Sequence, residues 1–247
     1  MDAPESHIET FRAARARVLD RIATACVRVA RDPAEVTLVA VSKTVPVETL
    51  RDAVAAGFEL LGENRVQEGA AKAAALPGVH WHMVGPLQSN KARRALEVFD
   101  SIQTVGSLDL ARRLDRLVPE TRPEARYPVL LEVNADLDPA KAGFRPADAE
   151  AAMGDLLELP HLDVRGLMTV GRLTARPAEA RGTFVALREL SAGWRMRWTG
   201  LGPELSMGMT DDFEIAVEEG ATIVRVGRAI FGERPHDHGD GDAQHEH

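Results

Sequence analysis

A lysine stands at the end of an apolar segment near the start of the chain. Residues 36–41 are apolar apart from Thr37, and Ser42-Lys43-Thr44 follows them directly. An amine held at the mouth of a buried strand is partly removed from water, which lowers its pKa and makes it a nucleophile. Its natural product with an aldehyde is a Schiff base. The structural alternative is a lysine whose alkyl chain covers the rim of the fold while its charge stays in water.

Lysine is scarce in this chain. Of its 30 lysine and arginine residues only four are lysines: Lys43, Lys72, Lys91 and Lys141. Arginine supplies the positive charge elsewhere, and it does not provide a deprotonatable amine. This bias favours a chemical role for Lys43. Lys91 and Lys141 are either secondary cofactor-holding amines or charges at the rim, and the sequence leaves both readings open.

Two glycine-containing turns lie towards the end of the chain. One falls in the segment "SMGMTDD" at residues 206–212, and the other is Gly227, in "VRVGR". Thr210 or Asp211 is expected to cap the helix that follows the first turn, with Glu214 completing a capping box. Free N–H groups at a helix start also suit a phosphate; plain capping is the alternative. A phosphate site opposite a reactive lysine points to pyridoxal phosphate, which carries both an aldehyde and a phosphate.

Arg225 lies inside an apolar segment, between Val224 and Val226. Strand alternation places it on the opposite face from the two valines. An inward arginine needs a polar partner, and the pyridine nitrogen of the cofactor and a salt bridge to a neighbouring strand are comparable candidates. An arginine at that nitrogen would keep it unprotonated and weaken the cofactor as an electron sink. Earlier in the chain, "GENRVQE" indicates a capping box from Asn64 to Gln67, which does not exclude a ligand contact by Asn64.

Short apolar runs alternate with helical patterns along the chain. We expect strands at 36–41, 60–61, 81–84, 102–105, 129–133, 164–168, 200–205 and 223–226. We expect helices at 5–31, 47–56, 66–76, 90–99, 108–118, 148–159, 177–192, 211–219 and 229–231. Repeated strand–helix units predict a parallel sheet, and eight units match an α/β fold of the (β/α)8 barrel type. A doubly wound open sheet is the alternative. In a barrel the carboxyl ends of the strands would gather all the candidate residues.

The expected organisation has three parts. Residues 1–34 form a helical segment packed on the barrel, 35–234 form the barrel, and 235–247 form a disordered acidic tail. The tail carries four histidines at 236, 238, 245 and 247. They could bind a metal weakly, but a solubilising tail is the favoured reading and no metal site is expected.

Composition excludes several classes of partner. The net charge of −8 and the pI near 5.5 argue against nucleic acid. No apolar run approaches the roughly 18 residues of a membrane span, and no apolar secretory signal is visible near the N-terminus. Cys26 is the sole cysteine, so no internal disulfide forms and a reducing cytoplasm is expected.

Several motifs resemble those of one family. "AVSKTVP", "GENRVQE", "HWHMVGPLQSNK", "NADLDPAKAGF", "RGLMTV" and "LSMGMTDDFEIAVEEGATIVRVGRAIFG" are similar, in order and spacing, to pyridoxal phosphate homeostasis proteins. The fold of that family is similar to the N-terminal barrel of alanine racemase. The resemblance implies pyridoxal phosphate as cofactor, held as a Schiff base on Lys43.

The resemblance also implies the surroundings of the cofactor. It places Arg225 at the pyridine nitrogen and the phosphate near Ser206, Thr210, Gly227 and Arg228. Further family positions near the cofactor are Asn64, His82, Asn134 and Met207. Two residues depart from the family pattern. Thr210 replaces the usual serine and keeps its hydroxyl. Arg228 replaces a threonine or serine, so a side-chain hydroxyl contact to phosphate is lost; the backbone N–H can remain, and the guanidinium could reach the phosphate itself.

The resemblance implies a cofactor carrier rather than an enzyme. In alanine racemase the second base is a tyrosine from another domain; here the sole tyrosine, Tyr127, precedes the fifth expected strand, and no second domain is expected. We therefore expect a monomeric cytosolic protein that buffers or delivers the cofactor, with apo forms of cofactor-dependent enzymes as possible recipients. A minimal racemase-like enzyme, with His82 as a possible base, and a cofactor-free Schiff-base aldolase are the alternatives.

Overall fold

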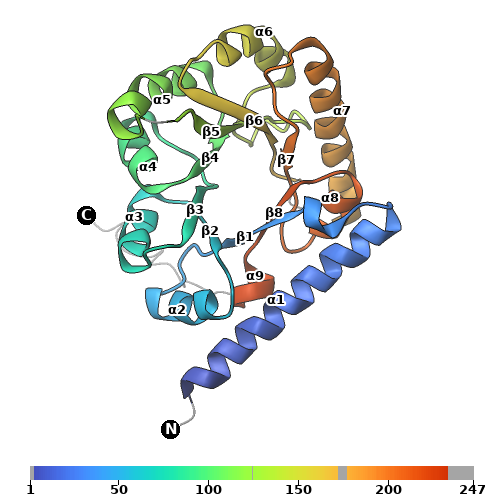
Figure 1. Ribbon diagram of the computed structural model, residues 1–247. Helices are drawn as coiled ribbons and strands as arrows, with labels where there is room; N and C mark the ends of the chain where they lie inside the picture. Colours follow the sequence, from blue (N-terminus) through green and yellow to red (C-terminus); the bar gives the residue numbers. More distant parts are fainter. Residues whose placement is uncertain (1–2, 124, 172–176, 233–247) are drawn as a thin grey trace, which may run out of the picture.

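Eight parallel strands close into a barrel at the centre of the molecule (Figure 1). The structure is a computed structural model that describes residues 3–123, 125–171 and 177–232. The strands follow one another in chain order, and β8 pairs with β1 through partners such as Val39 and Arg225. This closing pairing excludes the open doubly wound sheet and confirms the predicted (β/α)8 barrel.

The elements alternate as the sequence predicts. The strands are β1 (Thr37–Val41), β2 (Leu60–Glu63), β3 (His80–Met83), β4 (Ser101–Val105), β5 (Tyr127–Glu132), β6 (Leu162–Met168), β7 (Glu204–Ser206) and β8 (Ile223–Val226). The α-helices are α1 (Ala3–Arg28), α2 (Val47–Ala55), α3 (Val66–Ala75), α4 (Ala92–Val98), α5 (Leu108–Thr121), α6 (Pro146–Leu157), α7 (Arg181–Arg197), α8 (Phe213–Glu218) and α9 (Arg228–Phe231). Short 3-10 turns are η1 (Pro33–Glu35), η2 (Ser89–Lys91) and η3 (Pro177–Ala180).

The largest departure from the predicted strands lies at β7. The sequence predicts a strand over 200–205, but β7 covers only Glu204–Ser206. The preceding residues form a loop in which the N–H of Gly202 donates to the carbonyl of Val164 at 2.9 Å. A side chain at Gly202 would lie 2.3 Å from the carbonyl oxygen of Arg165, so this contact requires glycine. Leu201 is buried in the loop, which explains why the segment reads as a strand.

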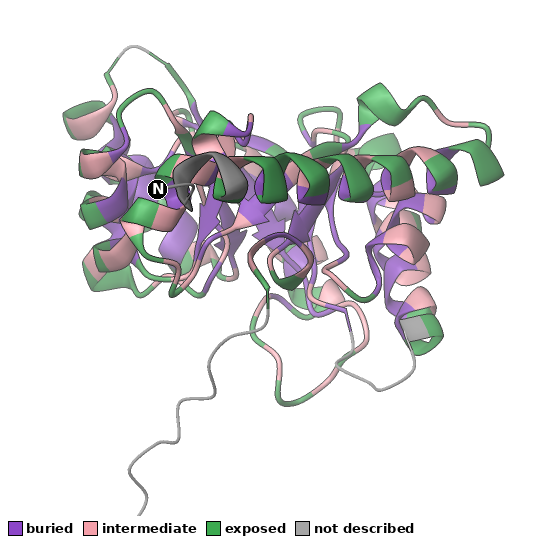
Figure 2. Cartoon of the chain, turned by 90° about the horizontal axis from the view of Figure 1, so that it is seen from below, coloured by how far each residue is buried: buried purple, intermediate pink, exposed green. Residues whose placement is uncertain are grey.

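The strands separate two apolar layers, one outside the barrel and one inside it. Outward-facing residues such as Ala40 and Val224 join the large core between the sheet and the helices. Inward-facing residues, among them Val39 and Leu130, form a small second cluster inside the barrel. Figure 2 shows the buried strands enclosed by helices whose outer faces are exposed. Each fully buried aliphatic side chain contributes about 1.5–3 kcal/mol, so these two layers fix which strand residues point towards the barrel axis.

Helix α1 lies along the outside of the barrel, beside α8 and α9 (Figure 1). Its buried residues Val18, Ile22 and Cys26 recur at helical spacing and join the outer core. Arg21 and Arg28 of the same helix form ion pairs with Glu214 and Glu218 of α8, at 3.0 and 2.6 Å. The helix therefore covers the side of the barrel where the first and last strands meet.

The part divisions at residues 34 and 234 stay predictions, and the expected tail at 235–247 lies outside the described residues. Helix α1 ends at Arg28, before the predicted residue 31, and Ala30 takes a left-handed backbone angle of φ 53°. No helix within the described ranges is long and apolar enough to cross a membrane. Those ranges also contain no group of three or more His, Cys, Asp or Glu residues suited to a metal ion.

Candidate cofactor site

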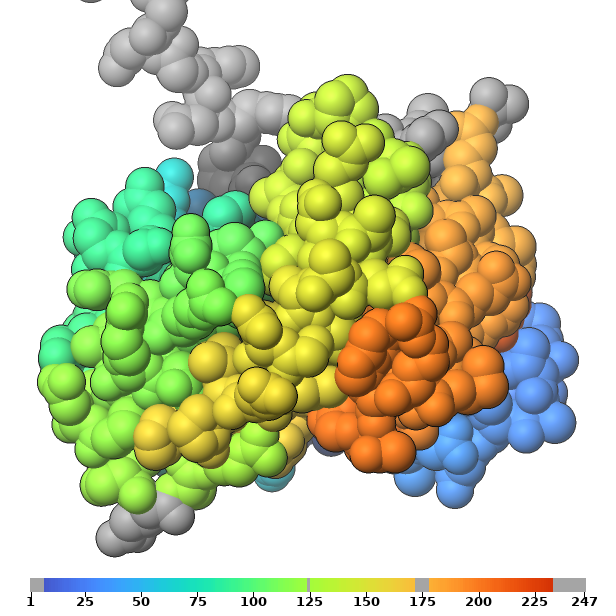
Figure 3. All heavy atoms as spheres, turned by 90° about the horizontal axis from the view of Figure 1, so that it is seen from above, coloured from blue at the N-terminus to red at the C-terminus, as the bar shows by residue number. Residues whose placement is uncertain are grey.

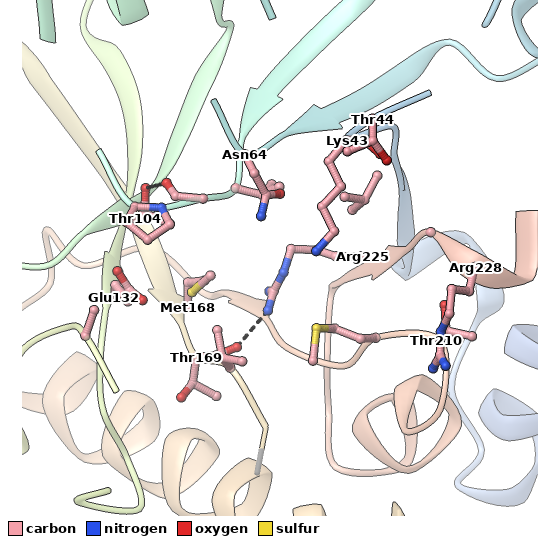
Figure 4. Close-up of a pocket in the computed structure, with 18 of the residues that line it drawn as sticks. Lys43, Thr44, Asn64, Thr104, Glu132, Met168, Thr169, Thr210, Arg225 and Arg228 are labelled. Atoms are coloured by element: carbon pink, nitrogen blue, oxygen red, sulfur yellow. Dashed lines mark hydrogen bonds between the residues drawn. The ribbon is translucent and has the colours of Figure 1, made fainter. Parts of the chain in front are cut away.

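A cavity of about 1030 Å³ opens at the carboxyl ends of the strands. This volume is that of a small-molecule or cofactor site. Seven of the predicted site residues line it: Lys43, Asn64, Asn134, Thr210, Arg225, Gly227 and Arg228. Figure 4 shows Lys43, Asn64 and Arg225 converging in the cavity, with Thr210 and Arg228 together at one side. The structure thus brings residues from five strand ends into one place, as a barrel mouth requires.

Strand alternation directs Lys43 into the cavity. On β1, Val39 belongs to the inner cluster and Val41 lines the cavity. Lys43 continues this inward series, whereas Ser42 is fully buried on the outer side of the barrel wall. The lysine is therefore a cavity residue and not a rim residue that only shields the fold.

Arg225 is held rigidly at the base of the cavity. It is only 4% exposed, and its guanidinium donates to the Ser206 hydroxyl at 2.6 Å and to the Thr169 carbonyl at 2.8 Å. Burial lowers its pKa to about 10, while the charges of Asp212 and Glu132 act in the opposite direction. The guanidinium thus stays protonated near neutral pH. The predicted inward orientation is confirmed, and its partners are a hydroxyl and a carbonyl rather than a salt-bridged carboxylate.

A hydrogen-bonded chain crosses the barrel beneath the cavity. The Ser206 hydroxyl donates to Gln103 Oε1 at 2.7 Å, and Gln103 Nε2 lies 2.8 Å from His82 Nδ1. Burial lowers the pKa of His82 to about 4, so the ring is neutral and accepts from the amide. Ser206 and His82 therefore support Arg225 from below and do not line the cavity. The predicted phosphate contact of Ser206 does not fit a hydroxyl already engaged in this way.

Met207 lies outside the cavity as well. Its side chain is fully buried in the outer core between sheet and helices. The residue follows Ser206 at the end of β7, and alternation turns it away from the barrel axis. Only the backbone of Met207 lies near the predicted cofactor position, because its side chain faces the helices.

The turn between β7 and α8 is ordered by its own backbone. The N–H of Met209 donates to Asp212 Oδ1 at 2.6 Å, and Gly208 adopts φ 92°. Within the described ranges, the N–H groups of Thr210 and Asp211 form no hydrogen bond to the protein. Asp212 is the N-cap residue of α8, which corrects the expected capping by Thr210 or Asp211. Two N–H groups are thereby left to meet an anion beside the cavity.

A second turn follows β8 at Gly227. An added Cβ there would lie 3.2 Å from the carbonyl oxygen of Val41, so β1 and this turn approach closely next to Lys43. Helix α9 begins at Arg228, and the first N–H groups of a helix lack intrahelical acceptors. The Arg228 side chain forms an ion pair with Asp211, and both side chains are largely exposed. Its guanidinium thus bridges the two turns at the rim of the cavity.

The two predicted asparagines play different parts. Arg65, not Asn64, is the N-cap of α3, so the expected capping box is wrong, and Asn64 instead lines the cavity. Asn134 accepts from the N–H of Asp138 at 3.0 Å and donates to its carbonyl at 2.7 Å. These bonds shape the segment after β5, which stands out from the surface in Figure 3. Lys141, in the same segment, pairs with Asp136 at 2.6 Å.

The sequence reasoning missed Glu132 and Thr169 as cavity residues. Glu132 is 8% exposed, and burial raises its pKa while Arg225 acts to lower it. The available signal was a carboxylate between Leu131 and Val133 in an apolar strand, the same pattern that singled out Arg225.

Tyr127 lies far from this chemistry. It is the first residue of β5, at the end of the barrel opposite the cavity, and its hydroxyl donates to the carbonyl of Phe99 at 2.6 Å. Burial raises its pKa well above the ordinary value for tyrosine. It therefore cannot act as a base at Lys43, which agrees with its predicted position before the fifth strand.

Known proteins are similar to this chain in sequence and in fold. Residues 19–235 match the family model described as the alanine racemase N-terminal domain. A pyridoxal phosphate homeostasis protein of Pseudomonas aeruginosa is 42% identical over 221 residues, covering 89% of this chain and 94% of the relative. One from Escherichia coli K12 is 39% identical over 227 residues, with 89% and 94% covered. The chain belongs to the pyridoxal phosphate homeostasis protein family.

Two solved structures resemble this chain at different levels of sequence identity. PipY of Synechococcus elongatus PCC 7942, solved with PLP bound, is 42% identical, with a TM-score of 0.76 and coverage of 87% of this chain and 100% of that one. Alanine racemase of Streptomyces coelicolor is 23% identical, with a TM-score of 0.68, and the match covers 92% of this chain but 59% of the racemase. The racemase likeness concerns the fold alone.

Proposed function

We propose that this chain binds pyridoxal 5'-phosphate and holds it through a Schiff base between Lys43 and the cofactor aldehyde, with loss of one water. The observation that carries the proposal is that Lys43 shares one cavity with two turns that present backbone N–H groups. The bound cofactor would supply an electrophilic aldehyde. The name of the solved relative with PLP bound supports the same cofactor.

The chain's own residues divide the work of binding. The N–H groups of Thr210 and Asp211, together with the turn at Gly227, would hold the phosphate. Arg225, fixed by Ser206 and Thr169, would face the pyridine nitrogen with its charge. A protonated arginine at that position disfavours protonation of the ring and so weakens the cofactor as an electron sink.

The proposed role is carriage of the cofactor, without a reaction of its own. A racemase needs bases on both faces of the reacting carbon, and Tyr127 lies at the far end of the barrel with its hydroxyl engaged. The names of the curated relatives support a role in pyridoxal phosphate homeostasis. We propose that the protein is a monomer in the cytoplasm, where it would buffer the cofactor or pass it to apo enzymes that require it.

Borohydride reduction followed by peptide mapping tests the proposal. The purified protein, incubated with pyridoxal 5'-phosphate, should yield a phosphopyridoxyl adduct on Lys43. The variant Lys43→Ala should fold and remain colourless, whereas Lys91→Ala, outside the cavity lining, should colour as the wild type does. An adduct exclusively on another lysine, or none, contradicts the proposal.

The racemase-like alternative has a separate test. Racemisation and transamination of free amino acids by the yellow protein should stay at the level of free pyridoxal 5'-phosphate. Turnover that Lys43→Ala abolishes would contradict the carrier role while leaving cofactor binding intact. Lys43→Ala is the control for the wild-type protein, since it should remove the bound cofactor but keep the barrel.

A further inference from the structure

A buried ion cluster lies directly behind Lys43. The Lys72 ammonium donates to Glu63 Oε1 at 2.6 Å, to Glu68 Oε1 at 2.7 Å and to the carbonyl of Ser42 at 2.7 Å. Lys72 is 4% exposed and Glu63 is fully buried. The three N–H donors of one ammonium thus bind two carboxylates and the backbone carbonyl of the residue that precedes Lys43.

The same cluster also holds the residue that follows Lys43. The N–H of Thr44 donates to Glu68 Oε1 at 2.6 Å, and the Ser42 hydroxyl donates to Glu63 Oε1 at 2.6 Å. Thr44 adopts φ 66°, a left-handed conformation that costs a residue with a branched side chain about 1–2 kcal/mol. The bond to Glu68 offsets that cost and turns the chain sharply after Lys43.

The cluster acts from outside the barrel wall. Ser42 points outward from the end of β1 and Glu63 outward from the end of β2, and Lys72 reaches them from α3. None of the three cluster residues Lys72, Glu63 and Glu68 lines the cavity. Their contacts with the wall of the cavity run through the backbone of residues 42–44.

We propose that Lys72 is a positioning residue for Lys43: it clamps the backbone on both sides of that lysine so that the amine is presented to the cavity in one orientation. This role rests on the proposed function of Lys43. Pre-organisation of a reacting group removes an entropic cost that a mobile group would bear at each encounter. The Lys72 clamp therefore accelerates Schiff-base formation without touching the ligand.

The variant Lys72→Met tests the clamp, because methionine keeps much of the length and loses all three donors. The rate of Schiff-base formation with pyridoxal 5'-phosphate should fall about tenfold or more, and the circular dichroism induced in the Schiff-base band should weaken. Hydrogen exchange of the peptide spanning residues 42–44 should accelerate in the protein without ligand, while the exchange of β8 stays unchanged. Lys72→Arg, which keeps charge and donors, should recover most of the rate.

Two further variants keep the outcome decisive. Lys91→Met is a matched substitution at a lysine for which no bond to Lys43 or its neighbours is found in the described ranges, and it should leave rate and spectrum unchanged. Glu68→Ala removes the acceptor of the Thr44 N–H at a half-exposed position, and it should slow the reaction about threefold. If Lys72→Met does not fold, an unchanged rate in folded Glu68→Ala overturns the proposal.

The results separate this role from the proposed function. A wild-type protein that traps the cofactor on Lys43, together with a folded Lys72→Met of unchanged rate and spectrum, removes the clamp alone. Unchanged exchange at residues 42–44 in Lys72→Met has the same effect. A wild-type protein that traps no cofactor on Lys43 removes the proposed function and the clamp with it.

Discussion

On the β1–β2 side of the cavity, the backbone around Lys43 rests on a buried ion cluster, whereas on the β7–β8 side the turns rest on glycine geometry and exposed ion pairs. Lys72 and Glu63 have side chains 6% and 0% exposed. Across the cavity, the side chains of Arg228 and Asp211 are 46% and 64% exposed. Both sides face the same ligand space, yet they depend on different physical terms.

The difference shows where substitutions act most strongly. Removing one partner of a buried ion pair leaves an uncompensated charge away from water, whereas an exposed pair is replaced by solvent and salt. The β1–β2 side of the cavity therefore depends on a few side chains. The β7–β8 side depends on backbone conformation, which most side-chain changes leave untouched.

The first prediction addresses the buried cluster. Glu63→Ala should lower the free energy of unfolding by about 3–5 kcal/mol, because it deletes a fully buried side chain and removes an acceptor from both Lys72 and the Ser42 hydroxyl. Urea denaturation at neutral pH measures the loss. Glu97→Ala, which breaks the exposed Arg94–Glu97 pair on α4, is the control and should cost less than about 1 kcal/mol. A loss for Glu63→Ala no larger than that for Glu97→Ala would contradict the dependence of the β1–β2 side on its buried cluster.

The second prediction addresses the glycine geometry. Gly208→Ala should cost about 2–4 kcal/mol, since it adds a left-handed penalty to overpacking. The new Cβ would lie 2.5 Å from the Cβ of Ala216 and 2.8 Å from the Cα of Phe213. Gly78→Ala is the matched control: its φ is 84°, but nothing lies within 4 Å of the added Cβ. A similar unfolding free energy for both variants would mean that the turn relaxes freely.

The third prediction concerns the hydrogen-bonded chain that runs from His82 on β3 to Arg225 on β8 beneath the cavity. The folded-state pKa of His82 is about 4, below the ordinary 6.5. Between these values the unfolded chain binds a proton that the folded chain does not, so stability falls as pH falls. His82→Gln should therefore lose roughly 2 kcal/mol less than the wild type between pH 7 and pH 5.

Urea denaturation at the two pH values measures this difference. His80→Gln, at the exposed end of the same strand, is the matched control for a histidine-to-glutamine substitution. A pH dependence that His82→Gln leaves unchanged would show that folding does not lower the pKa of the His82 ring.

The smallest loss of stability is expected at the outer surface of the β7–β8 side. Arg28→Ala breaks the pair with Glu218 at 2.6 Å, in which the Arg28 side chain is 46% exposed. The loss should stay below about 1 kcal/mol and shrink further in 1 M salt, since an exposed pair is screened. Thermal unfolding at two salt concentrations measures it. A loss above that of Gly208→Ala would show that ion pairs, and not glycine geometry, stabilise the β7–β8 side.

Patterns with a period of two residues were readable from the sequence. The apolar runs located the strands, and alternation oriented Arg225, because a strand has only two faces. The capping box at Asn64 and the capping by Thr210 or Asp211 were wrong: the N-cap residues are Arg65 and Asp212. Tertiary contacts decide where each helix begins, and a local side-chain pattern does not show them. The contact between Lys72 and Ser42 was not readable either, since it depends on how α3 packs against β1.

The cavity spans the place where the barrel closes. Lys43 follows β1 and Arg225 lies in β8, and these strands pair between residues as distant in sequence as Thr37 and Ile223. Contacts this far apart carry a high loop-closure cost and are expected to form late in folding. A ligand bridging β1 and β8 binds only the closed barrel, so it stabilises that state by mass action. Cofactor supply would thereby set how often the barrel opens at its seam, and with it the lifetime of the folded chain.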